Sequence, residues 1–246
     1  MESAHKKNKI VTFSISYLLL LFILGILFPI NGVLSGKRIK EFLSTNPQGK
    51  MIFYRQTIII QFVLATLVFA AMAFNRDSLD EIGLSFFRQP LLVLGLLAIC
   101  FLGWWLLWNY RFAPRRLRRS IERDAAVKFL FPTTKQEYHW SIGVSFAAGI
   151  SEEIVFRGFL YWQLAQFLPI IPSIILANLV FGLCHYGTGP KNAFLAFSLG
   201  VLLSILFLYT DSLFFLMIIH VLVDIYSMTK GKRYFDLNAE ENIILD

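Results

Sequence analysis

Seven blocks of mostly apolar residues constrain this chain more than any other feature. They cover residues 10–30, 52–74, 90–110, 139–165, 169–186, 191–209 and 211–229. A helix of about 20 residues crosses the roughly 30 Å hydrocarbon layer of a bilayer. Blocks of this length must be helical there, because each backbone amide has to find its hydrogen-bond partner inside its own segment. The sequence therefore predicts an all-α fold: a polytopic transmembrane bundle of about seven to eight helices.

Composition and charge agree with a multi-pass integral membrane protein. Charged residues make up 16% of the chain, against about 25% in soluble domains, which argues against a soluble fold. The net charge is +7, but the basic residues gather in the connections between blocks, where Lys and Arg mark the cytoplasmic side. We therefore expect membrane lipids as partners and no nucleic acid. The expected location is the inner membrane of a prokaryotic cell, with the N-terminus outside.

The blocks predict a single integral-membrane domain over residues 1–246. Residues 1–136 hold the first three spans and a basic cytoplasmic loop, 111–136; residues 137–229 form a helix bundle with the candidate site; residues 230–246 form a polar tail. The connection 36–50 has the composition of a short interfacial helix. Cys100 and Cys184 both lie inside apolar blocks, which argues against a disulfide framework.

Ionisable side chains inside the last four blocks are the informative exceptions to this pattern. Each costs about 2.5–3.5 kcal/mol at the centre of a spanning helix on insertion scales, so its presence needs a reason. Such residues are by default candidates for a functional site. They are Glu152, Glu153, Arg157, His185, His220 and Asp224.

On the fourth block, the spacing pairs Glu153 with Arg157 and leaves Glu152 without a partner. Glu153 and Arg157 are four residues apart on one helical face, in the favourable order for an ion pair. Glu152 lies about 100° further around the helix and has no such partner, which suits a general base. Gly149 and its two preceding alanines would let another backbone approach closely.

The histidines come from two other blocks. His185 closes the fifth block, and His220 and Asp224 share a face of the seventh at a spacing of four. A carboxylate at this spacing can fix the orientation of an imidazole. When the blocks are threaded through a bilayer, four of these side chains fall between its centre and its cytoplasmic face: Glu152, His185, His220 and Asp224. We therefore expect one water-filled cavity, open to the cytoplasm, that holds them all.

These residues resemble the family of CAAX proteases and bacteriocin-processing intramembrane proteases. That family shows Glu-Glu-x-x-x-Arg, then Phe-x-x-x-His, then His-x-x-x-Asn or Asp on successive membrane helices. Here the motifs read Glu152, Glu153 and Arg157; Phe181 and His185; His220 and Asp224. The resemblance covers about residues 137–228 and leaves the first three spans without a motif.

The resemblance implies a peptidase in which all six motif residues belong to the catalytic site. Glu152 and His185 would activate a water that attacks a peptide carbonyl, and the pair on the seventh block would stabilise the oxyanion or position the site. Asp224 suits orienting His220 or binding a metal, since an ionised carboxylate donates no hydrogen bond. The implied substrate is a peptide or protein, in eukaryotic members a prenylated one.

The need for a metal stays open at this point. Glu152, His185 and His220 would be a reasonable zinc set with one position left for water. However, the His-Glu-x-x-His signature of many zinc peptidases is absent, and the family resemblance also allows a metal-free glutamate mechanism.

Two other functions stay open beside intramembrane proteolysis. Buried carboxylates and histidines also relay protons in transporters, which would spread polar residues over the full depth of the membrane. A catalytically silent immunity or scaffold protein would keep its biological effect when the candidate residues are changed.

Overall fold

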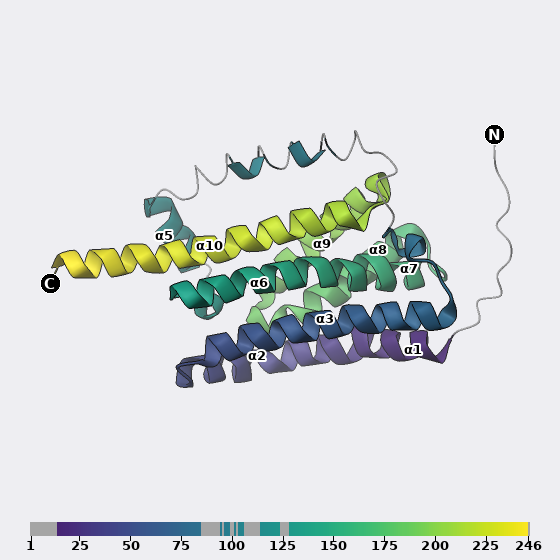
Figure 1. The fold of residues 1–246 in the computed structure, drawn as a ribbon, viewed down its shortest axis with the longest axis horizontal. Coiled ribbons are helices and arrows are strands. Elements are labelled where there is room, and N and C mark those ends of the chain that lie inside the picture. The colour runs from purple at the N-terminus through teal and green to yellow at the C-terminus, as the bar shows by residue number, and fades with distance from the viewer. Residues whose placement is uncertain are drawn as a thin grey trace.

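The computed structural model describes residues 14–84, 94, 96–98, 101, 103–105, 114–123 and 128–245. Among them there is no strand, and long helices run side by side along the molecule (Figure 1). This confirms the predicted all-α bundle. Most of the third apolar block, 90–110, and the first residues of the chain lie outside the described residues.

The N-terminal half forms a helical hairpin. Helix α1 (Ile15–Phe22), the π-helical turn η1 (Ile23–Leu27) and α2 (Phe28–Thr45) form one continuous helix, and α3 (Gly49–Asn75) returns beside it. The residues expected to form a separate interfacial helix therefore prolong α2. A short 3-10 turn, η2 (Leu79–Ile82), follows α3.

The C-terminal half carries the candidate residues on a further set of long helices. Helix α6 (Lys135–Glu152) continues through the π-helical η4 (Glu153–Leu160) into α7 (Tyr161–Leu164). Helix α8 (Ile170–Cys184) and the 3-10 turn η5 (Tyr186–Thr188) precede α9 (Pro190–Thr210), and α10 (Leu213–Leu245) ends the chain. Helix α6 lies between α3 and α10, and α8 packs against α9 and α2.

Within the described part of the chain, four helices are long and apolar enough to cross a membrane: Ile15–Thr45, Gly49–Asn75, Pro190–Thr210 and Leu213–Glu241. Helix α8 is apolar but has only 15 residues, fewer than a full span requires. Large apolar side chains such as Phe74 (79% exposed) and Ile171 (74% exposed) point outward. Lipid provides the apolar surroundings that such side chains lack in water, so the chain is an integral membrane protein.

The bundle has one main core and one smaller core. The main core joins α1, α3, η4, α8, α9 and α10 through residues such as Leu24, Val68, Phe159, Leu203 and Phe215, none of which is exposed. The smaller core contains Leu117 and Ile121 of helix α5 (Pro114–Arg123), Phe131, and Tyr234 of α10.

This smaller core revises two expectations from the sequence. The basic loop 111–136 contains helix α5, whose apolar side packs on α10, and the short 3-10 turn η3 (Lys128–Leu130). The residues from Lys230 onward, expected to be a polar tail, continue α10 as helix. The alternation of basic and apolar residues in 114–123 gives α5 its packing face.

Candidate active site

A capping box fixes the start of α6, the helix that carries the two glutamates. The Thr134 hydroxyl accepts from the Glu137 N–H at 3.1 Å, and the Glu137 carboxylate accepts from the Thr133 N–H at 2.7 Å and the Thr133 hydroxyl at 2.8 Å. Burial alone would raise the pKa of Glu137. These hydrogen bonds and the charge of Lys50 together lower it by more than burial raises it, so the pKa lies below its ordinary value of 4.5. Glu137 therefore anchors α6 as a carboxylate.

The two adjacent glutamates point into different surroundings. The Glu153 side chain is fully buried, whereas that of Glu152 is 13% exposed and lines a cavity. The helix changes from α to π geometry between these residues. Widened helical turns of this kind are frequent at functional sites. The spacing predicted that only Glu153 pairs with Arg157, and in the structure Glu152 faces the cavity instead.

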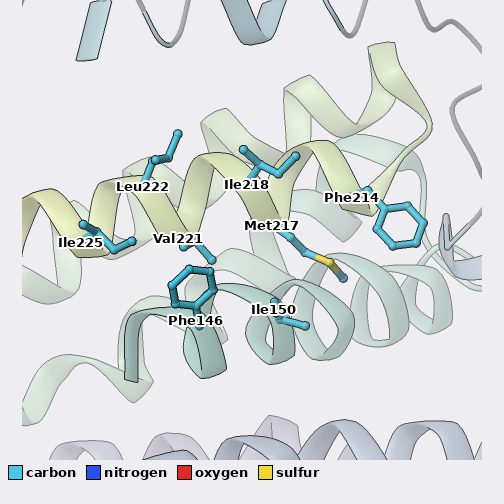
Figure 2. A pocket seen from close by; sticks show the side chains of 8 residues that line it. All are labelled: Phe146, Ile150, Phe214, Met217, Ile218, Val221, Leu222 and Ile225. Carbon is cyan, nitrogen blue, oxygen red and sulfur yellow. The ribbon is translucent and has the colours of Figure 1, made fainter. Parts of the chain in front are cut away.

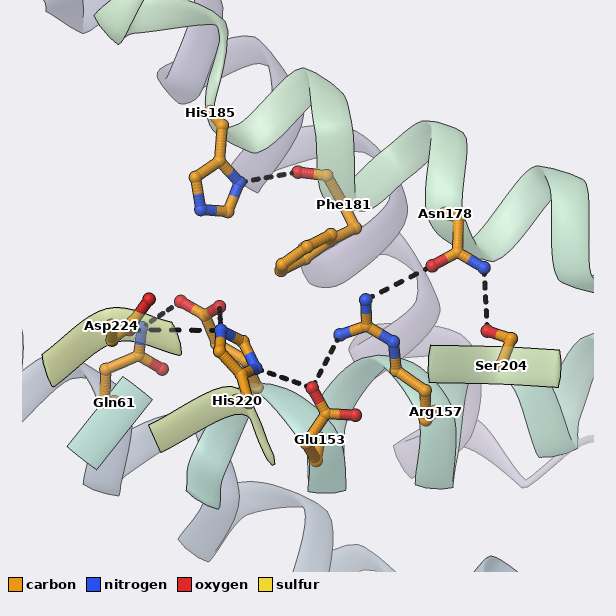
Figure 3. Close-up of polar contacts among 10 residues, drawn as sticks. Gln61, Glu153, Arg157, Asn178, Phe181, His185, Ser204, His220 and Asp224 are labelled. Atoms are coloured by element: carbon orange, nitrogen blue, oxygen red, sulfur yellow. Dashed lines mark hydrogen bonds and ion pairs between the residues drawn. The ribbon is translucent and has the colours of Figure 1, made fainter. Parts of the chain in front are cut away.

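Glu153 is the centre of a buried charged cluster. Its Oε1 accepts from Arg157 Nη1 at 3.0 Å and lies 2.6 Å from His220 Nδ1 (Figure 3). The predicted ion pair between Glu153 and Arg157 is confirmed. Because a carboxylate only accepts hydrogen bonds, Nδ1 must carry the proton in this contact. Glu153 thus fixes the orientation of the His220 ring and directs its Nε2 toward the cavity.

Asp224 lies at ion-pair distance from His220, at the spacing of four, but makes no hydrogen bond to it. Its Oδ2 lies 3.9 Å from His220 Nε2, beyond hydrogen-bond distance, and its side chain is 31% exposed. The reason is geometric: Nδ1 is already bonded to Glu153, so only Nε2 faces Asp224. Asp224 instead contributes a carboxylate to the cavity wall.

A second row of polar contacts fixes the other side of Arg157. Arg157 Nη2 donates to Asn178 Oδ1 at 3.3 Å, and Asn178 Nδ2 donates to the Ser204 hydroxyl at 2.8 Å (Figure 3). The guanidinium also lies over the Phe181 ring, 4.2 Å from its centroid, a favourable cation–π distance. Polar contacts therefore connect α9, α8, η4 and α10 in one chain that ends at His220.

His185 is held at the C-terminal end of α8. Its Nδ1 donates to the carbonyl of Phe181 at 2.9 Å, which leaves Nε2 free of that contact. Close packing of α2 places this end of α8: a Cβ built on Gly32 would lie 2.6 Å from the Cys184 carbonyl oxygen, and one on Gly36 only 2.1 Å from that of Gly187. These two glycines therefore let α2 approach the backbone on both sides of His185.

The candidate residues meet around a cavity of about 400 Å³. Four of the six ionisable residues line it, as the sequence predicted: Glu152, His185, His220 and Asp224. Its other walls come mainly from α3, α8, α9, α10 and the residues around η3, and they are largely apolar. They include Phe53, Thr57, Gln61, Leu130, Phe131, Phe181, Asn192, Leu195, Leu199 and Met228. The side chains of Glu153 and Arg157 lie behind this wall and support it.

The zinc set considered from the sequence is not assembled around one point in this structure. Among the described residues, no group of three His, Cys, Asp or Glu side chains is close enough together to hold a metal ion. His220 Nε2 lies 3.8 Å from Glu152 Oε2, but His185 is turned toward the Phe181 ring, at 4.7 Å between ring centroids. That ring also contacts His220, at 6.2 Å.

A larger apolar groove of about 600 Å³ lies between α6 and α10 (Figure 2). Its lining contains no titratable group: Phe146, Ile150, Phe214, Met217, Ile218, Val221, Leu222 and Ile225. On α6, Phe146 and Ile150 are offset by two residues from Ala148 and Glu152, which face the cavity. An offset of two is about 200° around a helix, so the groove lies on the opposite face of α6 from the polar cavity.

Sequence reasoning missed several residues that build the site. Gln61 and Asn178 are single amides inside apolar blocks, and that isolation was an available signal. Gly32 and Gly36 form a Gly-x-x-x-Gly pattern, another known signal for close helix contact. Gly200 had no signal, because its role depends on Asn178 and Arg157 lying opposite: its Cβ would be 2.2 Å from Asn178 Oδ1.

Comparison with known proteins gives one match. Residues 134–226 match the family model described as Type II CAAX prenyl endopeptidase Rce1-like. No curated protein and no solved structure matches the chain. The matched segment contains every motif residue on which the resemblance was based, and it holds α6, η4, α8 and the part of α10 that carries His220. Residues 134–226 are thus similar to the CAAX protease family, the peptidases that the motifs of this segment indicated.

Proposed function

We propose that the protein hydrolyses a peptide bond inside the membrane with a water activated by Glu152. The observation that supports this most is the shared cavity, in which a carboxylate and two imidazoles from three helices face one space. A general base must lie within hydrogen-bond reach of the proton it removes. Water beside Glu152 and a peptide carbonyl in the same cavity would satisfy this requirement.

Each cavity group has a role in the proposed mechanism. Glu152 removes a proton from water, and the resulting hydroxide attacks the scissile carbonyl. The Nε2 atoms of His185 and His220 face this reaction because their Nδ1 atoms are engaged elsewhere. We assign His185 to holding the water with Glu152. His220, with a proton on both ring nitrogens beside the three carboxylates, is assigned to the oxyanion. Glu152 passes the proton that it took from water to the leaving amine. Glu153 and Arg157 fix His220 and do not touch the substrate.

We propose that no step of this mechanism needs a metal ion. Among the described residues, no three His, Cys, Asp or Glu side chains lie close enough together to hold one, which supports this proposal. Activity should therefore survive treatment with a strong chelator and dialysis. Metal analysis of the purified, active protein would show zinc well below one atom per chain. Loss of activity on chelation, restored by zinc alone, would refute the metal-free assignment while leaving proteolysis in place.

The cavity walls suggest the class of substrate. The polar groups occupy one part of the lining, and aromatic and aliphatic side chains such as Phe53, Phe131, Leu195 and Met228 occupy the rest. A peptide with a hydrocarbon chain or large apolar side chains beside the scissile bond fits this division. Matched peptides with and without a prenylated cysteine would test it, and equal kcat/KM for both would contradict a lipid preference.

The direct test of the function is Glu152→Gln in proteoliposomes with a fluorogenic peptide. Removing a general base typically lowers the rate by about 10²–10⁴-fold, and we expect a loss in that range. Glu122→Gln makes the same chemical change on the exposed face of α5 and should leave the rate unchanged. A wild-type rate in Glu152→Gln would refute the proposal. Sided insertion would also show whether the cavity opens to the cytoplasm.

A further inference from the structure

Gln61 is a polar side chain in the middle of the apolar helix α3. Its neighbours in sequence are Ile58, Ile59, Ile60, Phe62 and Val63. A primary amide in such a stretch loses its hydration in the membrane, and it persists only where another interaction compensates. Gln61 also lies outside residues 134–226, so the family match assigns nothing to it.

The amide group of Gln61 contacts the proposed base directly. Gln61 Nε2 donates to Glu152 Oε1 at 2.6 Å (Figure 3 labels Gln61 beside Asp224). Only the amide nitrogen can donate, so the carboxylate fixes which way the amide points. The amide oxygen then faces away from Glu152; it is buried and has no hydrogen-bond donor among the described residues.

This hydrogen bond leaves the two oxygens of Glu152 in different positions. Oε1 is held by Gln61, and Oε2 lies 3.8 Å from His220 Nε2 on the cavity side. A carboxylate held at one oxygen has less freedom to rotate, so its other oxygen keeps a constant direction toward the reacting water. Catalytic groups act efficiently when outer hydrogen bonds fix them in this way.

We propose that Gln61 is a positioning residue that holds Glu152 in its working orientation. The inference rests on the proposed function, because it concerns the base of that reaction. It also gives α3, which carries no family motif, a part in the chemistry. Gln61 acts through Glu152 and is not required to contact the substrate.

The main test is Gln61→Met, which keeps the length of the side chain and removes the donor. Loss of an outer partner of a catalytic group typically costs about 10–100-fold. We expect kcat to fall in this range while KM stays within about threefold, because substrate contacts are unchanged. Gln56→Met is the matched control: it makes the same chemical change at an exposed position of α3 that does not line the cavity. It should keep the wild-type kcat.

The double variant Gln61→Met with Glu152→Gln separates positioning from folding. Once the carboxylate is gone, Gln61 has nothing to position, so its loss should not lower the residual rate of Glu152→Gln any further. A structural defect would lower both backgrounds equally. If Gln61→Met does not fold, Gln61→Asn, whose amide is one carbon shorter, replaces it with the same expected losses.

The outcomes distinguish the inference from the function beneath it. Wild-type kcat in Gln61→Met together with an inactive Glu152→Gln would overturn the positioning role alone. An equal loss of rate from Gln61→Met in both backgrounds would also overturn that role and leave the function in place. Full activity of Glu152→Gln would overturn the proposed function, and the inference with it.

Discussion

The substitution Gly200→Ala tests how tightly the polar chain behind the cavity is packed. A Cβ at this position would lie 2.2 Å from Asn178 Oδ1, 2.6 Å from Arg157 Nη2 and 3.0 Å from Asn178 Cγ. All three distances are at or below closest contact, and Asn178 is held by Arg157, Ser204 and the carbonyl of Ile174. The added methyl group therefore has to break or bend this set of hydrogen bonds.

The expected magnitude follows from two opposing effects. Overpacking a well-filled core typically costs about 1–3 kcal/mol, and a buried polar group left without its partner costs a further 1–3 kcal/mol or so. Alanine returns only about 0.5–1 kcal/mol through its better helix propensity. The net loss should be about 1–5 kcal/mol. For a chain of this size, 1 kcal/mol corresponds to roughly 2–4 °C in the midpoint of unfolding.

Gly25→Ala is the matched control for this experiment. Gly25 is also helical, but a Cβ there has nothing within 4 Å. Its midpoint should stay constant or rise slightly, while that of Gly200→Ala falls. Both midpoints can be followed by tryptophan fluorescence in detergent. Peptide cleavage should fall only in Gly200→Ala, because Arg157 fixes Glu153 and, through it, His220.

A rescue variant makes the reasoning refutable. Asn178→Ala removes the side chain that the new methyl group meets, so the double variant should lose less stability than the two single losses added together. An unchanged midpoint in Gly200→Ala would show that the contact is looser than the structure indicates. Strict additivity in the double variant would show that the damage arises elsewhere.

Three further outcomes follow from the same structure. Glu153→Met and Arg157→Met should each destabilise the protein by about 3–5 kcal/mol, since each removes the opposite charge from a buried partner. The double variant should be more stable than either single variant. Losses in the thermal unfolding midpoint that simply add would contradict an ion pair between the two residues. The stabilising effect of Glu137, measured against Glu137→Gln, should be complete above pH 4.5 and disappear as the pH falls through its lower folded-state pKa; a difference that grows in acid would have the wrong sign. Gly36→Ala should lower the unfolding midpoint and the cleavage rate together, because its Cβ would lie 2.1 Å from the Gly187 carbonyl oxygen beside His185. An unaltered cleavage rate would show that the packing of α2 does not position His185.

The parts of the fold that were predictable are those set by one-dimensional patterns. Long apolar blocks give helices whatever their neighbours are, and α3, α9 and α10 appear where their blocks lie. The gathering of Glu152, His185 and His220 was also predictable, since a membrane limits the depths at which costly polar groups can lie. The pairing of Glu153 with Arg157 followed from a spacing of four.

The remaining features depend on contacts between distant segments. The π-helical stretch at Glu153–Leu160 has no local signature in composition. The contact of Glu153 with His220 joins residues 67 positions apart, and it occupies the Nδ1 atom, so Asp224 faces Nε2. Gln61 belongs to a segment without any family motif, so only the folded arrangement places it beside Glu152.

The central claim is that Glu152, His185 and His220 serve one reaction in one cavity. The most direct measurement compares the cleavage rates of the three single alanine variants with that of the triple variant in the same proteoliposomes. When residues act as a unit, removing one of them costs about as much rate as removing all of them. The cleavage rate of the triple variant should therefore be about that of the slowest single variant. Losses that multiply across the three positions would show that the residues contribute independently and would contradict a single shared site.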